Sequence, residues 1–263
     1  MQISGSTVLL TGATGGIGHA IARALGARGA SLILTGRRAD VLEPLAAELN
    51  GRALAVDLCV PAEVDRLARQ AGEVDILVAN AALPASGTLD SFSLDEIDRA
   101  LDVNLRAPIV LAHAIAPGMV KRGRGHMLFM SSLSGKAATP GTALYNASKY
   151  GLRGFATALR ADLRTSGVGV SAVFPGFIRD AGMFADAGVK LPPGVGTRTP
   201  EDVAHAVVKA IERNRGEIDV APLPLRASTV FASLAPELAG RVGRRLGAEQ
   251  VSRDMEAGQR EKR

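Results

Sequence analysis

Short apolar runs alternate with segments of helical periodicity along most of this chain, and the alternation limits the folds open to it. We expect strands at Thr7–Thr11, Ser31–Thr35, Ala53–Val56, Ile76–Ala79, His126–Ser131, Val168–Phe174 and Ile218–Ala221. Between them, apolar residues recur at helical spacing, which predicts helices over residues 17–25, Val41–Leu49, Ala62–Ala71, Leu94–Val120, Ala143–Ser166 and Thr199–Asn214. Strands that are apolar throughout and alternate with helices form a parallel sheet covered on both faces. The sequence therefore predicts an α/β fold with an open, doubly wound parallel sheet.

The last part of the chain departs from this alternation. We expect one domain over residues 1–225 and a basic tail over residues 226–263. In the tail, apolar residues recur every four positions with arginines beside them, at Leu234, Leu238, Val242, Leu246, Arg241, Arg244 and Arg245. This spacing predicts an amphipathic helix. Its apolar stripe is expected to pack on the domain; the alternative is a stripe that docks on a membrane surface or a partner.

Composition excludes several classes of site. The 263 residues include one cysteine, Cys59, so an intrachain disulfide is excluded. The four histidines are scattered, with no pair at ligand spacing, so no metal site is expected. The net charge is +5, but the chain has no Trp and two Tyr, so it lacks aromatic rings on which bases could stack. We therefore expect no metal and no nucleic acid as partner.

Targeting signals are not evident in the sequence. The first residues lack a basic segment followed by a long apolar run, so no secretory signal is expected. The longest mostly apolar stretch, Ala107–Val120, is too short to span a bilayer. Together with the single cysteine, these features favour a cytoplasmic protein without membrane contact.

A glycine-rich turn joins the first expected strand to the first expected helix. It consists of Thr11-Gly12-Ala13-Thr14-Gly15-Gly16-Ile17-Gly18. At the carboxyl end of a strand in such a sheet, glycines let the backbone approach a pyrophosphate, and the helix N-terminus offers free N–H groups. We therefore expect a dinucleotide to bind at Gly12, Thr14, Gly15, Gly16, Ile17 and Gly18; the alternative is an ordinary tight turn.

The end of the second expected strand indicates which dinucleotide. NAD-binding domains carry an acidic residue there for the ribose hydroxyls, whereas this chain has Gly36 followed by Arg37 and Arg38. A guanidinium matches a 2′-phosphate in charge and in bidentate geometry. The two arginines therefore favour NADP(H), with NAD(H) as the alternative cofactor, unless they are simply a solvated pair in a loop.

Four polar residues form a candidate catalytic set. Tyr145 and Lys149 are four residues apart in an expected helix, so a phenol and an ammonium share one face. Ser132 follows an expected strand, and Asn104 lies in an earlier helix. For carbonyl reduction, Tyr145 would be the general acid/base and Ser132 would donate a hydrogen bond to the reacting oxygen. The charge of Lys149 is expected to lower the pKa of Tyr145 from its ordinary value near 10.

Together, these motifs resemble the short-chain dehydrogenase/reductase family, over roughly residues 5–221. Its glycine turn, Asn-Ala element and Pro-Gly element correspond here to residues 11–18, 80–81 and 175–176. The resemblance implies a Rossmann-type domain with a catalytic tetrad of Asn104, Ser132, Tyr145 and Lys149. It also implies cofactor contacts by Tyr145, Lys149, Asp57, Leu58, Asn80, Ala81, Pro175, Gly176 and Ile178.

The resemblance also assigns roles to individual residues. Lys149 would bind the nicotinamide ribose, and Asn104 would hold a water in a proton relay. Asp57 would bond the adenine amine, with a helix cap as the alternative. Two positions differ from the family's pattern, because Ala82 and Asp180 stand where members carry glycine and often threonine. Asp180 therefore leaves the contact with the nicotinamide amide open.

These features predict an oxidoreductase that transfers a hydride between NADP(H) and a small carbonyl or alcohol substrate. The loop Arg179–Arg198 contains Met183, Phe184, Val189 and Leu191, which favour an apolar substrate. Family members commonly pair through the two long helices, so we also expect a homodimer or homotetramer. The alternative function is a catalytically silent, dinucleotide-sensing regulatory protein, against which the intact Ser132, Tyr145 and Lys149 argue.

Overall fold

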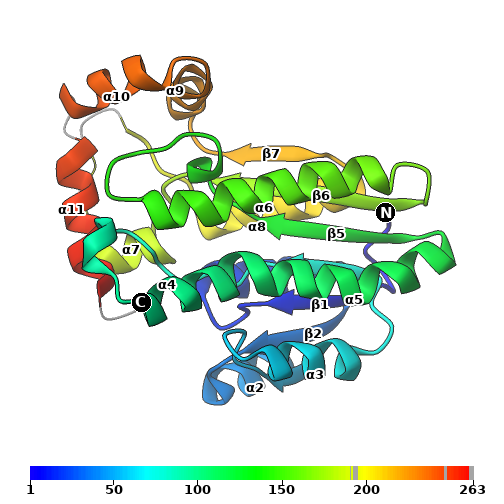
Figure 1. Ribbon diagram of the computed structural model, residues 1–263. Coiled ribbons are helices and arrows are strands. Elements are labelled where there is room, and N and C mark those ends of the chain that lie inside the picture. Colours follow the sequence, from blue (N-terminus) through cyan, green and yellow to red (C-terminus); the bar gives the residue numbers. More distant parts are fainter. Residues whose placement is uncertain (190, 192–194, 246–247, 261–263) are drawn as a thin grey trace.

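A seven-stranded parallel sheet forms the centre of the computed structural model, which describes residues 1–189, 191, 195–245 and 248–260. The strand order is β3-β2-β1-β4-β5-β6-β7, and every pair is parallel (Figure 1). The strands are β1 (Thr7–Thr11), β2 (Ser31–Gly36), β3 (Arg52–Ala55), β4 (Ile76–Ala79), β5 (Gly125–Met130), β6 (Val168–Pro175) and β7 (Glu217–Val220). The order reverses between β1 and β4, which confirms the doubly wound sheet and puts a ligand crevice at the carboxyl ends of these strands.

Helices cover both faces of the sheet, as the fully apolar strands require. One face packs on α3 (Pro61–Ala71), α5 (Ala107–Arg122) and α6 (Ala143–Asp162), and the other on α1 (Gly16–Gly26), α2 (Ala39–Glu48) and α8 (Pro200–Glu212). Buried leucine, isoleucine and valine side chains of strands and helices form a separate core on each side. The predicted α/β class, with helices on both faces of the sheet, is therefore confirmed.

Local signals set where several of these helices begin. At α8, the Thr199 hydroxyl accepts the backbone N–H of Asp202, whose carboxylate accepts the N–H of Thr199, and Pro200 follows at the first helical position. Ser93 and Glu96 form the same reciprocal cap at α4 (Leu94–Leu101). Such boxes satisfy backbone donors that a helix N-terminus leaves free. The cap and proline predicted at Thr199 and Pro200 are thus present.

The long helix expected over Leu94–Val120 is interrupted. After α4 the chain makes one turn of π-helix, Asp102–Arg106, before α5 begins at Ala107. The 29-residue segment Leu94–Arg122 is long and apolar enough to cross a membrane by length and composition. However, Leu111, Ala112 and Met119 are buried against the sheet, so α5 acts as a core helix.

The C-terminal tail differs most from expectation. It forms three helices instead of one: α9 (Leu223–Leu234), α10 (Pro236–Arg245) and α11 (Ala248–Gln259). Pro236 explains the break, since a proline favours a first helical position and cannot continue the preceding helix. Leu234, Leu238 and Val242 are exposed, so the expectation that the stripe packs on the domain is wrong for these three; Leu246 lies outside the described residues.

The long loop before α8 also contains structure. A short helix, α7 (Met183–Ala187), lies within the expected loop Arg179–Arg198, and α11 runs along it (Figure 1). The Gln259 amide donates to the carbonyl oxygen of Met183 at 3.2 Å, and Gly258 lies close to Ala187. The end of the chain therefore packs on α7, beside the carboxyl ends of the strands.

Candidate active site

The glycine turn lies between β1 and α1, at the crevice. Gly12 has a φ of +68°, and a Cβ there would lie 2.7 Å from the Cα of Ala81. Only glycine combines that conformation with so close an approach. Gly15 precedes α1 and caps it with no side chain, and the first turn contains no acidic residue. The N–H groups at the start of α1 are thus left for an anionic group.

Asn80 and Thr11 hold this turn against the next strand. The Thr11 hydroxyl oxygen accepts the backbone N–H groups of Asn80 and Ala81, both at 3.0 Å. The Asn80 amide donates to the carbonyl oxygens of Thr11 and Gly12, at 3.1 and 3.2 Å. The Asn-Ala element therefore fixes the shape of the glycine turn, a structural role beside the predicted contact with a cofactor.

Arg37 and Arg38 are exposed at the end of β2, next to the same turn. The Arg38 guanidinium donates to the carbonyl oxygen of Thr14 at 2.6 Å. Gly36 lies against the Thr14 side chain, which a Cβ at Gly36 would approach to 2.8 Å. Positive charge therefore stands beside the glycine turn, with Arg38 also bracing it.

The other predicted cofactor residues differ in what they offer. Asp57 Oδ1 accepts the backbone N–H of Cys59 at 2.9 Å and closes a turn before α3, so it is not the helix cap. Leu58 and Ile178 are buried in the two cores, which leaves their backbones for any cofactor. Pro175 ends β6, and the N–H of Gly176 is bonded to the carbonyl oxygen of Val220 at 3.1 Å.

Ser132, Tyr145 and Lys149 come together at this edge of the sheet. Ser132 follows β5, and Tyr145 and Lys149 lie one turn apart on α6. Lys149 is 1% exposed, and its Nζ lies 5.6 Å from the centre of the Tyr145 ring and donates to the carbonyl oxygen of Met130 at 2.9 Å. The loop after Ser132 lies so close to α6 that it requires glycine at position 135, where a Cβ would lie 2.7 Å from the carbonyl oxygen of Lys149.

Burial shifts the pKa values of Tyr145 and Lys149 in the directions that favour the neutral form of each group. It raises the pKa of Tyr145 to about 12, against a smaller lowering by a hydrogen bond with Ser132. It lowers the pKa of Lys149 to about 8. The expectation that Lys149 lowers the Tyr145 pKa is therefore wrong for this structure: the ammonium lies beside the ring and bonds Met130, and loss of solvation dominates.

Asn104 lies in the π turn and is fully buried. Its Oδ1 accepts the backbone N–H of Leu83 at 2.7 Å, and its Nδ2 donates to the carbonyl oxygen of Leu83 at 2.9 Å. Single π turns inside α-helices are frequent at functional sites. Here the side chain ties this turn to the segment after β4, and the predicted water relay stays a prediction.

Two further residues that the sequence did not single out support the tetrad. The Asn146 amide donates to the carbonyl oxygens of Ser134 and Ala137 at 2.7 and 3.1 Å, and so ties the loop after Ser132 to α6. The Ser131 hydroxyl donates to the carbonyl oxygen of Lys149 at 3.0 Å. Their positions next to Tyr145 and Ser132 are the only signal in the sequence that could have found them.

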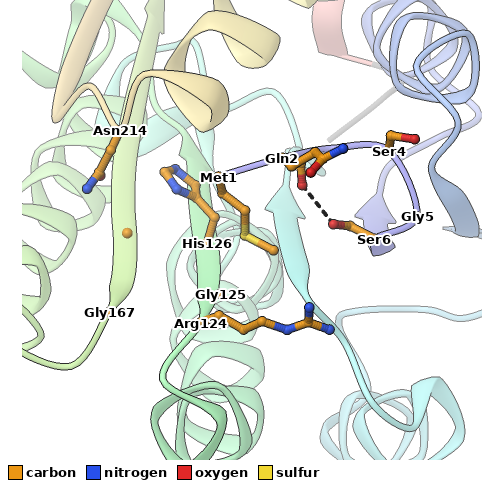
Figure 2. A pocket seen from close by; sticks show the side chains of 11 residues that line it. Met1, Gln2, Ser4, Gly5, Ser6, Arg124, Gly125, His126, Gly167 and Asn214 are labelled. Atoms are coloured by element: carbon orange, nitrogen blue, oxygen red, sulfur yellow. Dashed lines mark hydrogen bonds between the residues drawn. The ribbon is translucent and has the colours of Figure 1, made fainter.

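A different pocket opens at the amino-terminal edge of the sheet (Figure 2). It measures about 390 Å³ and is lined in part by Met1, Arg124 and His126. Burial lowers the pKa of His126 to about 3, and its Nε2 lies 2.8 Å from the hydroxyl of Ser171. None of the predicted catalytic residues lines this pocket, so we assign His126 a structural role.

The described part of the chain contains no group of three or more His, Cys, Asp or Glu that could hold a metal ion.

The comparisons with known proteins agree with this geometry. A sequence model of the short chain dehydrogenase family matches residues 6–190. Ketoacyl reductase HetN of Nostoc sp. is 36% identical over 242 residues, 89% of this chain and 84% of that protein. Dehydrogenase/reductase SDR family member 7B of Xenopus laevis is 32% identical over 258 residues, which are 90% and 80% of the two chains.

A solved structure is similar over nearly the same length. The short-chain dehydrogenase from Sphingobium yanoikuyae in complex with NADPH superposes with a TM-score of 0.77 at 28% identity, over 89% of this chain and 95% of that one. The likeness thus extends over most of both chains. The chain is a member of the short-chain dehydrogenase family of oxidoreductases.

Proposed function

We propose that this protein reduces a carbonyl compound with NADPH, and that Tyr145 supplies the proton. The observation that carries the proposal is the meeting of Ser132, Tyr145 and Lys149 at the carboxyl edge of the sheet, beside a glycine turn with free backbone donors. In such a reduction the cofactor supplies the hydride to carbon, and the protein supplies the proton to oxygen.

The residues around the glycine turn fit a dinucleotide phosphate. Gly15 leaves the start of α1 uncapped by a side chain, which suits a pyrophosphate. Arg37 and Arg38 stand beside Thr14 with no acidic residue at the end of β2, which suits a 2′-phosphate. These residues would hold NADP(H), the cofactor form bound in the similar structure from Sphingobium yanoikuyae.

The protonation state of Tyr145 suits reduction. With its pKa raised to about 12, the phenol holds its proton at neutral pH and can give it to a developing alkoxide. Ser132 would donate a hydrogen bond to the same oxygen. Lys149, whose pKa is lowered to about 8, is mostly charged at pH 7, so its ammonium would donate hydrogen bonds to the ribose of a bound nicotinamide.

The surroundings of Tyr145 favour an apolar substrate. Ala85, Leu144 and Ile97 form a small apolar cluster against which Tyr145 packs. Apart from this cluster, the ring centres of Phe177, which follows β6, and Phe184 of α7 lie 5.0 Å apart. One relative is named a ketoacyl reductase. A 3-ketoacyl thioester is therefore the first substrate to test, within a panel of ketones, aldehydes and steroids.

The test is NADPH oxidation by the purified protein with this panel. We expect Tyr145→Phe to lower kcat by about 100-fold or more, since general acid catalysis contributes at least that much, and to leave the dissociation constant of NADPH unchanged. Tyr150→Phe is the matched control, because Tyr150 is exposed on the same helix. Retention of more than about a tenth of the wild-type rate by Tyr145→Phe would rule out the assigned role.

We further propose that the protein forms a homo-oligomer through α5 and α6. A groove of about 430 Å³ is lined almost wholly by apolar side chains of these helices, including Ile109, Ala116, Val120 and Leu159. A face of this kind on two packed helices suits a two-fold pairing of like surfaces.

We also propose that the protein is located in the cytoplasm. Its single cysteine, Cys59, suits a reducing compartment.

A further inference from the structure

Helix α9 is packed on the body of the protein along one side only. Leu225 packs against the core beneath β6, and a Cβ at Gly176 would meet it at 3.0 Å. Thr229 is buried, and the Ser233 hydroxyl donates to the carbonyl oxygen of Lys136 at 2.6 Å. These residues recur at spacings of four along the helix and so share a face. That inner face anchors α9.

The opposite face of α9 is apolar but exposed. Leu223 is 73% exposed and Leu234 is 82% exposed, and Val230 and Phe231 between them are exposed as well. At 100° per residue, Leu223, Val230 and Leu234 lie within about 40° of one another. A surface helix of a globular protein ordinarily turns its polar residues to solvent. Helix α9 does the reverse, so its outer face is built to be covered.

Helix α10 continues this surface. It packs on α9 (Figure 1), and beyond the break at Ala235 it adds two exposed apolar side chains, those of Leu238, which is 51% exposed, and Val242. Arg241, Arg244 and Arg245 lie on the same short helix and are exposed. Apolar side chains are thus placed directly beside guanidinium groups.

Charge decides which occupant this surface fits. Residues 223–245 contain four arginines and one glutamate, a net charge of +3. A second copy of the chain would bring like charges together, which disfavours self-pairing here. Exposed leucine and phenylalanine with flanking arginines is the pattern of helices that lie in the interface of an anionic bilayer.

We propose that α9 and α10 form a membrane-surface docking site, whose apolar side chains enter the interfacial layer of a bilayer while the arginines bind anionic lipid headgroups. The proposal is independent of the reaction proposed above. Because α9 is fastened to Lys136 and Gly176, close to Ser132 and Pro175 in the chain, docking would hold the active-site edge of the sheet near the lipid.

The test is co-sedimentation of the purified protein with vesicles. We expect binding to vesicles of about three parts phosphatidylcholine to one part phosphatidylglycerol, and at least about tenfold weaker binding to phosphatidylcholine alone. Leu234→Ser with Leu238→Ser should lower affinity for the anionic vesicles at least about tenfold. Replacing Arg241, Arg244 and Arg245 by glutamine should remove the preference for anionic vesicles.

The matched control is Leu94→Ser, which removes a similarly exposed leucine from α4, away from α9 and α10 (Figure 1); it should bind vesicles like the wild type. Since every replaced side chain is exposed, all variants should keep their melting temperature and circular dichroism. No sedimentation of the wild type at about 50 mM salt, or equal binding by the double serine variant, would overturn the proposal. The proposal would also be overturned if light scattering showed an oligomer that is lost in the double serine variant and kept in the other variants. The exposed face of α9 and α10 would then bind another copy of the chain.

Discussion

At the scale of single residues, we expect Arg37 and Arg38 to make separable contributions to the binding of NADP(H) beside the glycine turn. Arg38 also braces the carbonyl of Thr14, whereas Arg37 is exposed and no hydrogen bond in the described residues ties it to that turn. We expect Arg37→Ala to weaken NADPH binding by about 1–3 kcal/mol and to leave NADH binding unchanged. Arg38→Ala should weaken binding of both cofactors, because the turn loses its brace.

Fluorescence titration with the two cofactors measures these effects. Arg28→Ala serves as the control, because Arg28 is an exposed arginine beyond the opposite end of α1 from the glycine turn, where it pairs with Glu212 at 3.6 Å. If Arg37→Ala weakened NADPH and NADH binding equally, Arg37 would not bind the 2′-phosphate.

His126 links stability to pH at the opposite edge of the sheet. Burial lowers its pKa to about 3 from an ordinary 6.5. Between these two pH values, the unfolded chain therefore holds a proton on this imidazole that the folded protein does not hold. Stability is therefore full above pH 6.5 and falls below it, by about 1.4 kcal/mol per pH unit. Urea unfolding at pH 7 and pH 5 should show a loss about 2 kcal/mol larger for the wild type than for His126→Gln. Equal losses in the two proteins would contradict this assignment.

At the scale of elements, the π turn between α4 and α5 depends on one side chain. Asn104 satisfies both backbone groups of the buried segment at Leu83. Asn104→Ala should lower the free energy of unfolding by about 2–4 kcal/mol, because a buried donor and a buried acceptor lose their partners. Asn104→Asp keeps the acceptor but turns an oxygen towards the carbonyl oxygen of Leu83 in a fully buried site, so it should lose at least as much. The midpoints of urea unfolding, compared at equal m-values, measure the stability of both variants. An unchanged midpoint for the alanine variant would show that the backbone groups of Leu83 find other partners.

At the scale of the whole molecule, the proposed assembly and the proposed membrane docking would use different faces. The α5–α6 groove is apolar, while α9 and α10 add arginines to their exposed leucines. We expect light scattering at micromolar concentration to give a multiple of 27.2 kDa, and Val120→Glu to give the monomer, because a carboxylate cannot be buried in that groove without a partner. Leu89→Glu, at another exposed leucine, should leave the mass unchanged. A wild-type mass near 27.2 kDa at every concentration would refute the pairing.

Interactions between residues close in sequence made much of the fold predictable from the sequence. Apolar periodicity located every strand of the sheet within about two residues, and the cap at Thr199 located the start of α8. The glycine turn and the spacing of Tyr145 and Lys149 were also predictable, because a turn conformation and a shared helix face depend on neighbouring residues only. From these features followed the family, and on them rests the proposed place of the active site.

Only the tertiary structure decided what depends on distant neighbours. Whether Leu234 and Leu238 are covered depends on which surfaces lie opposite them, and no local pattern states that. Asn104 is tied to Leu83, a partner outside its own helix. The pKa of Tyr145 rises instead of falling because burial among segments remote in sequence outweighs the hydrogen bond with Ser132. Solvation is a property of the packed molecule, and periodicity within one helix does not determine it.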